Sequence, residues 1–116
     1  MIKKVGIDIV TNSRIQKNLL IAGFIKRILS PKEYEYYQKM TNDQRKLEFL
    51  CGRFAVKEAI FKAFTSNGTK LSFCDITIDY DVSGSPIVRC DKIDTEILIS
   101  ISHCEEYTIA MALLQK

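Results

Sequence analysis

The chain has 116 residues, of which 47% are apolar, and a formal net charge of +3. This composition excludes a disordered chain, and the length suits a single domain, 1–116, with one core. Because no apolar run approaches the ~20 residues of a membrane helix and the amino terminus lacks a signal-peptide layout, we expect a cytoplasmic protein without a membrane partner.

The amino-terminal part of the chain predicts one strand followed by short helices. Residues 3–10 form an apolar run rich in β-branched side chains, which is typical of a strand. The polar residues 11–13 are candidate N-caps for a helix over 14–21. Gly23 interrupts this pattern, and the segment FIKRIL after it supplies one or two further helical turns.

Two capping signals mark the starts of longer helices. SPKE at 30–33 combines a serine N-cap, a proline at the first helical position and a glutamate three residues beyond the cap, which predicts a helix over 31–40. TNDQ at 41–44 repeats the signal and opens a long helix. We expect this helix to run to about Phe64 and to be ended by SNG at 66–68.

The second half of the chain alternates between apolar and polar residues, as half-buried strands do. Strands are expected over 73–81, 87–90, 95–102 and 107–114, with a turn at SGSP, 83–86. In the first of these strands, one face would carry Cys74, Ile76, Ile78 and Tyr80. In the third, the inward side chains would be Ile97, Ile99 and Ile101. The order of a strand, helices and then an antiparallel meander predicts an α+β fold, with one long central helix packed on an antiparallel sheet.

Four cysteines are scattered through the chain without a CxxC pair. Zinc binding is therefore not expected, and free, mostly buried thiols are the simplest interpretation. The four are Cys51, Cys74, Cys90 and Cys104.

The charges are distributed unevenly along the chain. Residues 1–70 hold 14 Lys and Arg against 6 Asp and Glu, whereas residues 71–116 hold 3 against 8. The basic half should attract an anionic partner, either a nucleic acid, a phosphorylated cofactor or an acidic protein. The alternative is a solvated helical surface without a partner.

One carboxylate in the long predicted helix conflicts with the pattern around it. At about 100° per residue, Glu58 falls at the centre of the apolar stripe, between Cys51 and Phe54. An unpaired carboxylate there would be costly or would stay protonated, so it needs a cation. Lys62, at i+4, is one candidate and would form an ordinary helix ion pair. A bound metal ion is the other.

A second carboxylate, Asp8, lies inside the otherwise apolar first strand. Taken alone it could be a satisfied hydrogen-bond acceptor at a strand end. If the strand packs on the long helix near Glu58, however, the two carboxylates could share one hard cation. Two carboxylates without a cysteine–histidine cluster favour Mg²⁺ together with a phosphorylated ligand.

Basic side chains surround this region: Arg45, Lys46, Arg53, Lys57 and Lys62. Arg53 and Lys57 are four residues apart and share a helix face, so we expect a ladder that can hold a pyrophosphate and a further phosphate. The alternative is that these residues serve solubility. The single histidine, His103, follows a predicted strand, where it could bind a phosphate or be structural.

Three segments together resemble one family. GID at 6–8, FAVKEAIFKA at 54–63 and SISH at 100–103 are similar to the signatures of the holo-acyl-carrier-protein synthases, the AcpS-type 4′-phosphopantetheinyl transferases. The resemblance implies that the chain moves 4′-phosphopantetheine from coenzyme A to a serine of apo acyl carrier protein and releases adenosine 3′,5′-bisphosphate. It also implies the 4′-phosphopantetheinyl transferase fold. Members of the family form homotrimers with active sites at subunit boundaries, so a homotrimer is expected here too.

The resemblance also implies roles for individual residues. Asp8 and Glu58 would ligate Mg²⁺, and a metal-bound water or Glu58 itself would take the serine proton. Lys62 would be catalytic by stabilising the leaving bisphosphate. The residues expected to bind coenzyme A are Arg45, Lys46, Arg53, Lys62 and His103. Those expected to meet the carrier protein are Arg14, Phe24 and Arg27.

The chain departs from the family pattern in three places. Phe61 stands where a serine is frequent, so one polar contact to coenzyme A is in doubt. The glycine-rich loop after the helix is reduced to TSNGTK, and Leu20 and Gly23 lie near positions that are often basic. Either carrier recognition leans more on Phe24 and Arg27, or the carrier differs from that of familiar members.

Two other classes of function compete with the transferase. One is a small RNA-binding domain, but no RNP-type motif occurs and the predicted sheet half is acidic, so we expect no nucleic-acid partner. The other is a noncatalytic adaptor for an acidic helical partner, in which Glu58 simply pairs with Lys62.

Overall fold

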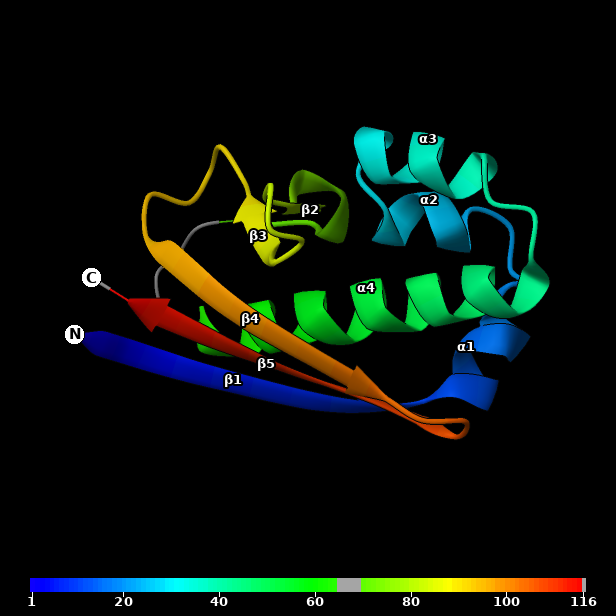
Figure 1. Ribbon diagram of the computed structural model, residues 1–116, viewed down its shortest axis with the longest axis horizontal. Coiled ribbons are helices and arrows are strands. Elements are labelled where there is room, and N and C mark those ends of the chain that lie inside the picture. The colour runs from blue at the N-terminus through cyan, green and yellow to red at the C-terminus, as the bar shows by residue number, and fades with distance from the viewer. Residues whose placement is uncertain (65–69, 116) are drawn as a thin grey trace.

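A computed structural model of the chain describes residues 1–64 and 70–115. Figure 1 shows the elements. The SNG segment at 66–68, which was expected to end the long helix, lies outside the described residues. In chain order the elements are β1 (Ile2–Thr11), α1 (Asn12–Asn18), α2 (Phe24–Ile28), α3 (Pro31–Gln38), α4 (Asp43–Ala63), the 3₁₀ turn η1 (Phe73–Asp75), β2 (Thr77–Tyr80), β3 (Pro86–Arg89), β4 (Glu96–His103) and β5 (Tyr107–Gln115).

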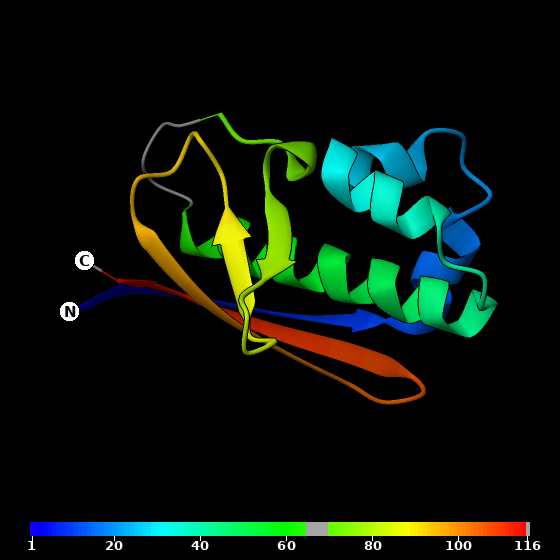
Figure 2. The same cartoon turned by 45° about the horizontal axis from the view of Figure 1, so that its top comes forward.

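The strands form two sheets rather than one meander. β1, β5 and β4 make an antiparallel sheet with β5 in the centre, and β2 pairs only with β3. Figures 1 and 2 show α4 lying between this three-stranded sheet and a layer made of α2, α3 and the β2–β3 ribbon. The predicted α+β class, with a long helix on an antiparallel sheet, is confirmed.

The helix starts follow the capping signals closely. Ser30 and Glu33 form the predicted capping box, in which the Glu33 amide donates to Ser30 Oγ over 3.3 Å and the Ser30 amide donates to Glu33 Oε1 over 2.9 Å. The second signal is shifted by one residue: Asn42, not Thr41, caps α4, and its side chain accepts a hydrogen bond from the Arg45 amide at 2.9 Å. The first helix is shorter than predicted and ends at Asn18, before a turn that leads to Gly23 with φ at 79°.

The first predicted strand of the second half begins later than its alternation suggests. Residues 73–75 form η1, held by a capping box between Ser72 and Asp75. Ile76 and Ile78 are buried as predicted, whereas Cys74 and Tyr80 are exposed. The alternation therefore holds only over the two isoleucines, because the 3₁₀ turn takes Cys74 out of the strand.

The cysteines also differ from the prediction. Cys51 is buried, and burial together with the Glu48 charge raises the pKa of its thiol to about 11. Cys74 and Cys104 are exposed and Cys90 is half-buried, so the expectation of mostly buried thiols is wrong. All four are free, as predicted.

Within residues 1–64 and 70–115, no helix is long and apolar enough to cross a bilayer. The cytoplasmic location stays a prediction.

The outer face of the three-stranded sheet is apolar and uncovered in the single chain. The strand register places Ile7 opposite Met111 and Ile9 opposite Ile109 on this face. All four side chains are exposed. An apolar patch of this kind on one face of a sheet marks an interaction surface.

The inner face of β1 touches α4 at a glycine. A Cβ placed on Gly6 would lie 1.9 Å from the carbonyl oxygen of Ala59 and 3.0 Å from the amide nitrogen of Ala63. No side chain fits in that space, so the strand backbone rests directly on the helix backbone. Asp8 is the next residue whose side chain points to the same side of β1.

We expect Gly6→Ala to lower the free energy of unfolding by about 3 kcal/mol, because the added methyl must push β1 away from α4. Chemical denaturation followed by circular dichroism measures this change. Gly52→Ala is the matched control. Its new Cβ would meet only Ile101 Cγ2 at 3.8 Å, and helix propensity favours alanine by about 1 kcal/mol. Equal stability of the two variants would contradict the close approach.

Candidate functional site

The close packing of β1 on α4 brings together three ionisable side chains, Asp8, Glu58 and Lys62, which we call the Asp8 cluster. Lys62 Nζ lies 3.0 Å from Asp8 Oδ1 and 3.1 Å from the carbonyl oxygen of Ile7. The Asp8 side chain is 14% exposed and that of Lys62 is 54% exposed. The cluster therefore lies at the surface with its carboxylate end half-buried.

Glu58 is perturbed by its position in this cluster. Burial raises the pKa of its carboxyl, and the Asp8 charge raises it further, while Lys62 and Arg14 lower it. Glu58 is half-buried rather than at the centre of a buried stripe. The geometry thus brings the two unusual carboxylates of the sequence within electrostatic range of each other, with Lys62 and Arg14 beside them.

The donor set of the cluster fits one metal class better than others. Among the described residues, no group of three or more His, Cys, Asp or Glu side chains is arranged to hold a metal ion, which argues against a closed zinc site. Two carboxylates are the usual protein share of a Mg²⁺ shell that substrate phosphate and water complete. Burial is the main cause of the raised pKa of Glu58, and a divalent cation between the two carboxylates would offset the additional effect of the Asp8 charge.

Arg53 and Lys57 do not form the exposed ladder that their spacing suggested, and this prediction is wrong. Arg53 is 5% exposed and Lys57 0% exposed. Both pair with the buried carboxylate of Glu33. These three residues form what we call the buried hub.

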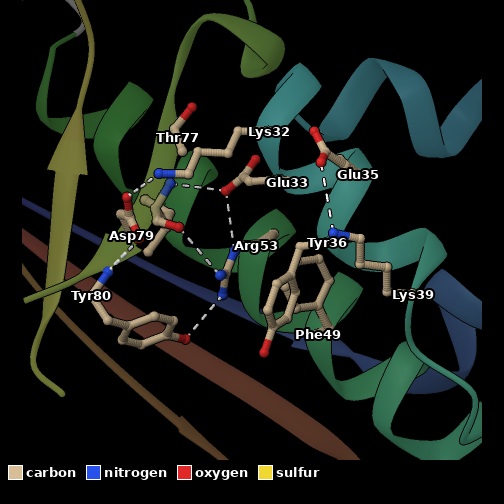
Figure 3. A pocket seen from close by; sticks show the side chains of 11 residues that line it. Lys32, Glu33, Glu35, Tyr36, Lys39, Phe49, Arg53, Thr77, Asp79 and Tyr80 are labelled. Carbon is tan, nitrogen blue, oxygen red and sulfur yellow. Dashed lines mark hydrogen bonds and ion pairs between the residues drawn. The ribbon is translucent and has the colours of Figure 1, made fainter.

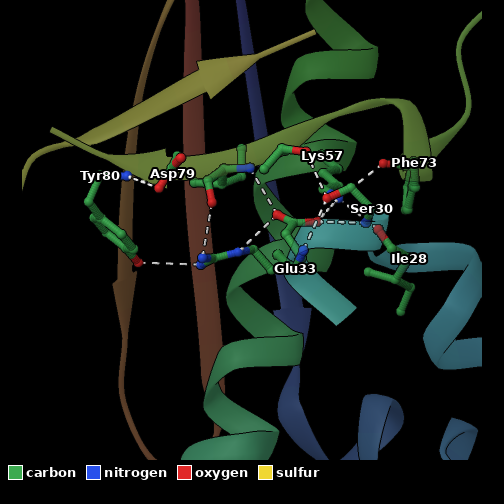
Figure 4. A network of polar contacts seen from close by, with 10 residues as sticks. Ile28, Ser30, Glu33, Lys57, Phe73, Asp79 and Tyr80 are labelled. Carbon is green, nitrogen blue, oxygen red and sulfur yellow. Dashed lines mark hydrogen bonds and ion pairs between the residues drawn. The ribbon is translucent and has the colours of Figure 1, made fainter. Parts of the chain in front are cut away.

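The buried hub ties several segments to α4 (Figure 4). Lys57 Nζ donates to Glu33 Oε1, to the carbonyl of Ile28 over 2.7 Å and to that of Phe73 over 3.0 Å. Burial lowers the pKa of Lys57, and the Glu33 charge opposes this shift. Every described buried side-chain nitrogen and oxygen has a hydrogen-bond partner, so the hub is fully satisfied and costs no orphaned polar group.

Arg53 completes the hub on the side of the β2–β3 ribbon. Its Nε donates to Glu33 Oε2 over 3.1 Å, its Nη2 to the Ile78 carbonyl over 3.3 Å and its Nη1 to the Tyr80 hydroxyl over 3.4 Å. Its guanidinium also stacks on the Phe49 ring, 4.2 Å from the centroid. Figure 3 shows this arrangement at the wall of a pocket of about 280 Å³.

Sequence reasoning missed Glu33 as a partner for these cations. The signal was present, since Glu33 stands in the capping box of α3, where it was expected to serve only its own helix start. In the structure the Glu33 carboxylate both caps α3 and pairs with the two cations. Its Oε1 accepts from the Ser30 amide and from Lys57, and its Oε2 accepts from Arg53 and from the Ile78 amide.

The other predicted binding residues lie elsewhere in the fold, at the start of α4 and at the end of β4. Arg45 is exposed in the first turn of α4, and Lys46 lies over the Tyr37 ring at 5.1 Å. His103 is exposed at the end of β4. Because β5 separates β4 from β1, the single chain does not bring His103 into the Asp8 cluster.

The residues expected to meet a carrier lie on α1 and α2. Arg14 and Arg27 are exposed, and Phe24 is half-buried with its ring 6.4 Å from that of Phe54. Phe61, the departure from the family pattern, packs edge-on against Phe73 with ring centroids 4.7 Å apart. At this position the chain therefore has a ring contact with η1 instead of a polar group.

Comparison with known proteins agrees with the geometry. The family model described as the 4′-phosphopantetheinyl transferase superfamily matches residues 4–112. The chain belongs to this superfamily.

Curated relatives and solved structures extend the match over the whole chain. The holo-[acyl-carrier-protein] synthase of Bacillus velezensis is 43% identical over 119 residues, covering 100% of this chain and 98% of that protein. The Bacillus subtilis enzyme of the same name is 40% identical over 122 residues, with coverages of 100% and 98%.

Two similar solved structures contain a ligand. A holo-(acyl-carrier-protein) synthase from Bacillus anthracis in complex with CoA (3′,5′-ADP) has a TM-score of 0.84 and 37% identity, covering 98% of this chain and 96% of that one. The Helicobacter pylori enzyme in complex with coenzyme A has a TM-score of 0.79 and 32% identity, with coverages of 96% and 99%.

The raised pKa of Glu58 has a consequence for stability. The folded state binds this proton more tightly than the unfolded chain, so the contribution of Glu58 favours folding at acid pH and is lost as the pH rises through the folded-state pKa. We therefore expect Glu58→Gln to be more stable than the parent protein at about pH 7, and the difference to vanish at about pH 3.5.

Denaturant unfolding in chelator-treated buffer at both pH values measures this difference. Glu35→Gln is the control, since Glu35 forms an exposed pair with Lys39 on α3 and such pairs contribute little. A loss of stability in Glu58→Gln at neutral pH would show that cations already satisfy this carboxylate in the folded chain.

Proposed function

We propose that the chain is a holo-[acyl-carrier-protein] synthase that moves 4′-phosphopantetheine from coenzyme A to a serine of apo acyl carrier protein in a Mg²⁺-dependent reaction. The observation that carries the proposal is the Asp8 cluster in a chain of this superfamily. Coenzyme A in the related Bacillus anthracis and Helicobacter pylori structures supports the donor substrate.

The reaction exchanges the phosphoanhydride bond of coenzyme A for a phosphodiester bond to serine. The serine oxygen of the carrier attacks the phosphorus that bears pantetheine, the pyrophosphate bond breaks, and adenosine 3′,5′-bisphosphate leaves. Bound Mg²⁺, held by Asp8 and Glu58, would supply neutralisation of the diphosphate charge. Without a cation between them, two carboxylates beside a diphosphate would repel the substrate.

The side chains of this cluster divide the remaining work. The serine proton would go either to Glu58 itself or to a water molecule held by the bound metal, since both can act as general bases. The ammonium of Lys62, half-exposed beside Asp8, stabilises the charge that develops on the departing bisphosphate.

Coenzyme A binding draws on the exposed cations near the start of α4 and on His103. Arg45 and Lys46 are accessible at this end of the helix, and a guanidinium and an ammonium suit phosphate groups. The proposed contact of Arg53 with coenzyme A stays a prediction. Its three hydrogen bonds in the buried hub favour a role in holding the site together.

The carrier protein would dock on α1 and α2. Arg14 and Arg27 provide charge for an acidic helical partner, and Phe24 provides an apolar contact. Leu20, which is 91% exposed, and Ile21 lie in the turn between these helices. These apolar side chains fill the region where family members often carry basic residues, so recognition in this chain is less purely electrostatic.

A homotrimer with shared sites completes the proposal. The exposed outer face of the sheet, which includes Ile7, Ile9, Ile109 and Met111, offers an apolar surface for another protomer. Within one chain, β5 lies between the strand that carries Asp8, β1, and the strand that carries His103, β4. A neighbouring protomer would bring its own His103 to the coenzyme A bound at this chain's cluster.

Mass spectrometry of apo acyl carrier protein incubated with the enzyme, coenzyme A and Mg²⁺ tests the reaction. We expect the carrier to gain one phosphopantetheine group and a chelator to prevent the gain. Asp8→Asn and Glu58→Gln should each reduce the rate by about 100-fold or more, whereas Glu35→Gln should not. Normal transfer by either cluster variant would contradict the metal assignment.

The trimer is tested by the mass of the particle in solution. We expect Ile109→Glu to give a monomer, because the new carboxylate lies at the centre of the outer sheet face. Val82→Glu is the control, since Val82 is a fully exposed apolar side chain that lies off this face. Light scattering on all three proteins at micromolar concentration distinguishes the outcomes, and a monomeric parent protein would refute the assembly.

A further inference from the structure

The side chain of Asn12 connects the start of α1 to the hairpin between β4 and β5. Its Nδ2 donates to the carbonyls of Cys104 and Glu105, each over 3.1 Å. Its main-chain amide donates to the carbonyl of Glu106 over 2.9 Å. Figure 1 shows this hairpin next to α1 at one end of the sheet.

Thr108 fixes the orientation of the side-chain amide of Asn12. Its Oγ1 donates to Asn12 Oδ1 over 2.7 Å, and both side chains are buried. The Asn12 amide therefore uses its oxygen and both donor directions, and rotating it would break three hydrogen bonds at once. Burial strengthens this arrangement, because a displaced amide would leave unpaired polar groups away from water.

His103 lies at the base of the hairpin that this network holds. In the antiparallel register His103 is directly opposite Thr108, and Cys104 follows it into the turn. The turn itself is closed by the Cys104 amide donating to the Tyr107 carbonyl over 2.9 Å. Without the Asn12 side chain, the exposed turn would lose both of its side-chain anchors to α1.

The hairpin also forms part of a pocket. Residues of α1, the first turns of α4 and the hairpin border a cavity of about 850 Å³, and the border includes Asn12, Gln44, His103 and Cys104. An imidazole on the wall of a cavity binds a ligand well only if the wall does not move, since each ordered group would otherwise cost entropy on binding.

We propose that Asn12 and Thr108 are positioning residues that hold His103 for coenzyme A. This inference rests on the proposed function, specifically on the role of His103 in binding coenzyme A. The two residues do not touch the substrate. They fix the turn after His103, so the imidazole is presented in one orientation before the ligand arrives.

Isothermal titration calorimetry with coenzyme A and the full-length protein tests the inference. We expect Thr108→Val, which keeps the shape of the side chain but removes the hydroxyl, to weaken coenzyme A binding by about fivefold. Thr108→Ser, which keeps the hydroxyl, should restore binding. Asn12→Asp, which can still accept from Thr108 but cannot donate to the two carbonyls, should weaken binding as Thr108→Val does.

Thr77→Val is the matched control for loss of a threonine hydrogen bond. Thr77 Oγ1 donates to Ser30 Oγ over 2.7 Å in the other layer of the fold. This variant should lose stability in thermal unfolding without a change in coenzyme A affinity. With saturating coenzyme A, the kcat of Thr108→Val should match that of the parent protein, because only binding is affected.

A double-mutant cycle with His103→Ala separates the two levels of the proposal. We expect His103→Ala to weaken binding and Thr108→Val to have no further effect in that background. If His103→Ala binds coenzyme A normally, the proposed role of His103 is wrong. If His103→Ala weakens binding but Thr108→Val does not, or if the two effects simply add, the positioning role is overturned.

Discussion

The contact between the backbones of β1 and α4 at Gly6 is the constraint on which the rest of the site depends. The carbonyl of Ala59 occupies the space that any side chain at residue 6 would need. Two residues along the strand, Asp8 points to the same side, and Glu58 and Lys62 are one and three residues from Ala59 on the helix. The separation of the two backbones that carry these carboxylates is thus set by a direct backbone contact. This is the type of precision that a shared cation and a diphosphate require.

The opposite side of α4 is fixed by a different kind of interaction. The buried hub of Glu33, Arg53 and Lys57 joins α4 to the end of α2, to the start of α3 and to β2. The helix therefore has an apolar sheet on one side and a satisfied ionic network on the other. Lys57 directly precedes Glu58 in the chain, so the residue that anchors the helix inside the fold and the half-buried carboxylate of the Asp8 cluster are held by the same turn.

Local chemistry in the sequence predicted much of the fold, and pairing over long distances was harder to predict. The capping box of Ser30 and Glu33 marked a helix start because its partners are three residues apart. The burial of Lys57 depends on a carboxylate 24 residues away, and a helical wheel contains no information about that. The wheel also assumed one buried face, whereas α4 is covered from two directions, which is why Glu58 was placed too deep. Asp8 and Glu58 stood out because a carboxylate in an apolar pattern is an anomaly whichever partner it finds.

The partners of the buried hub also constrain how this chain can diverge. Among the described residues, and apart from the Tyr80 hydroxyl, the hydrogen bonds that the three charged side chains make outside the trio go to main-chain groups, at residues 28, 30, 73 and 78. Every amino acid offers a carbonyl, and all except proline offer an amide, so substitutions there leave the contacts available. Substitution of one of the three charged residues would leave a buried charge without its partner. Descendants of this sequence are therefore free to vary the connecting segments, while the three charges should be inherited or replaced as a set.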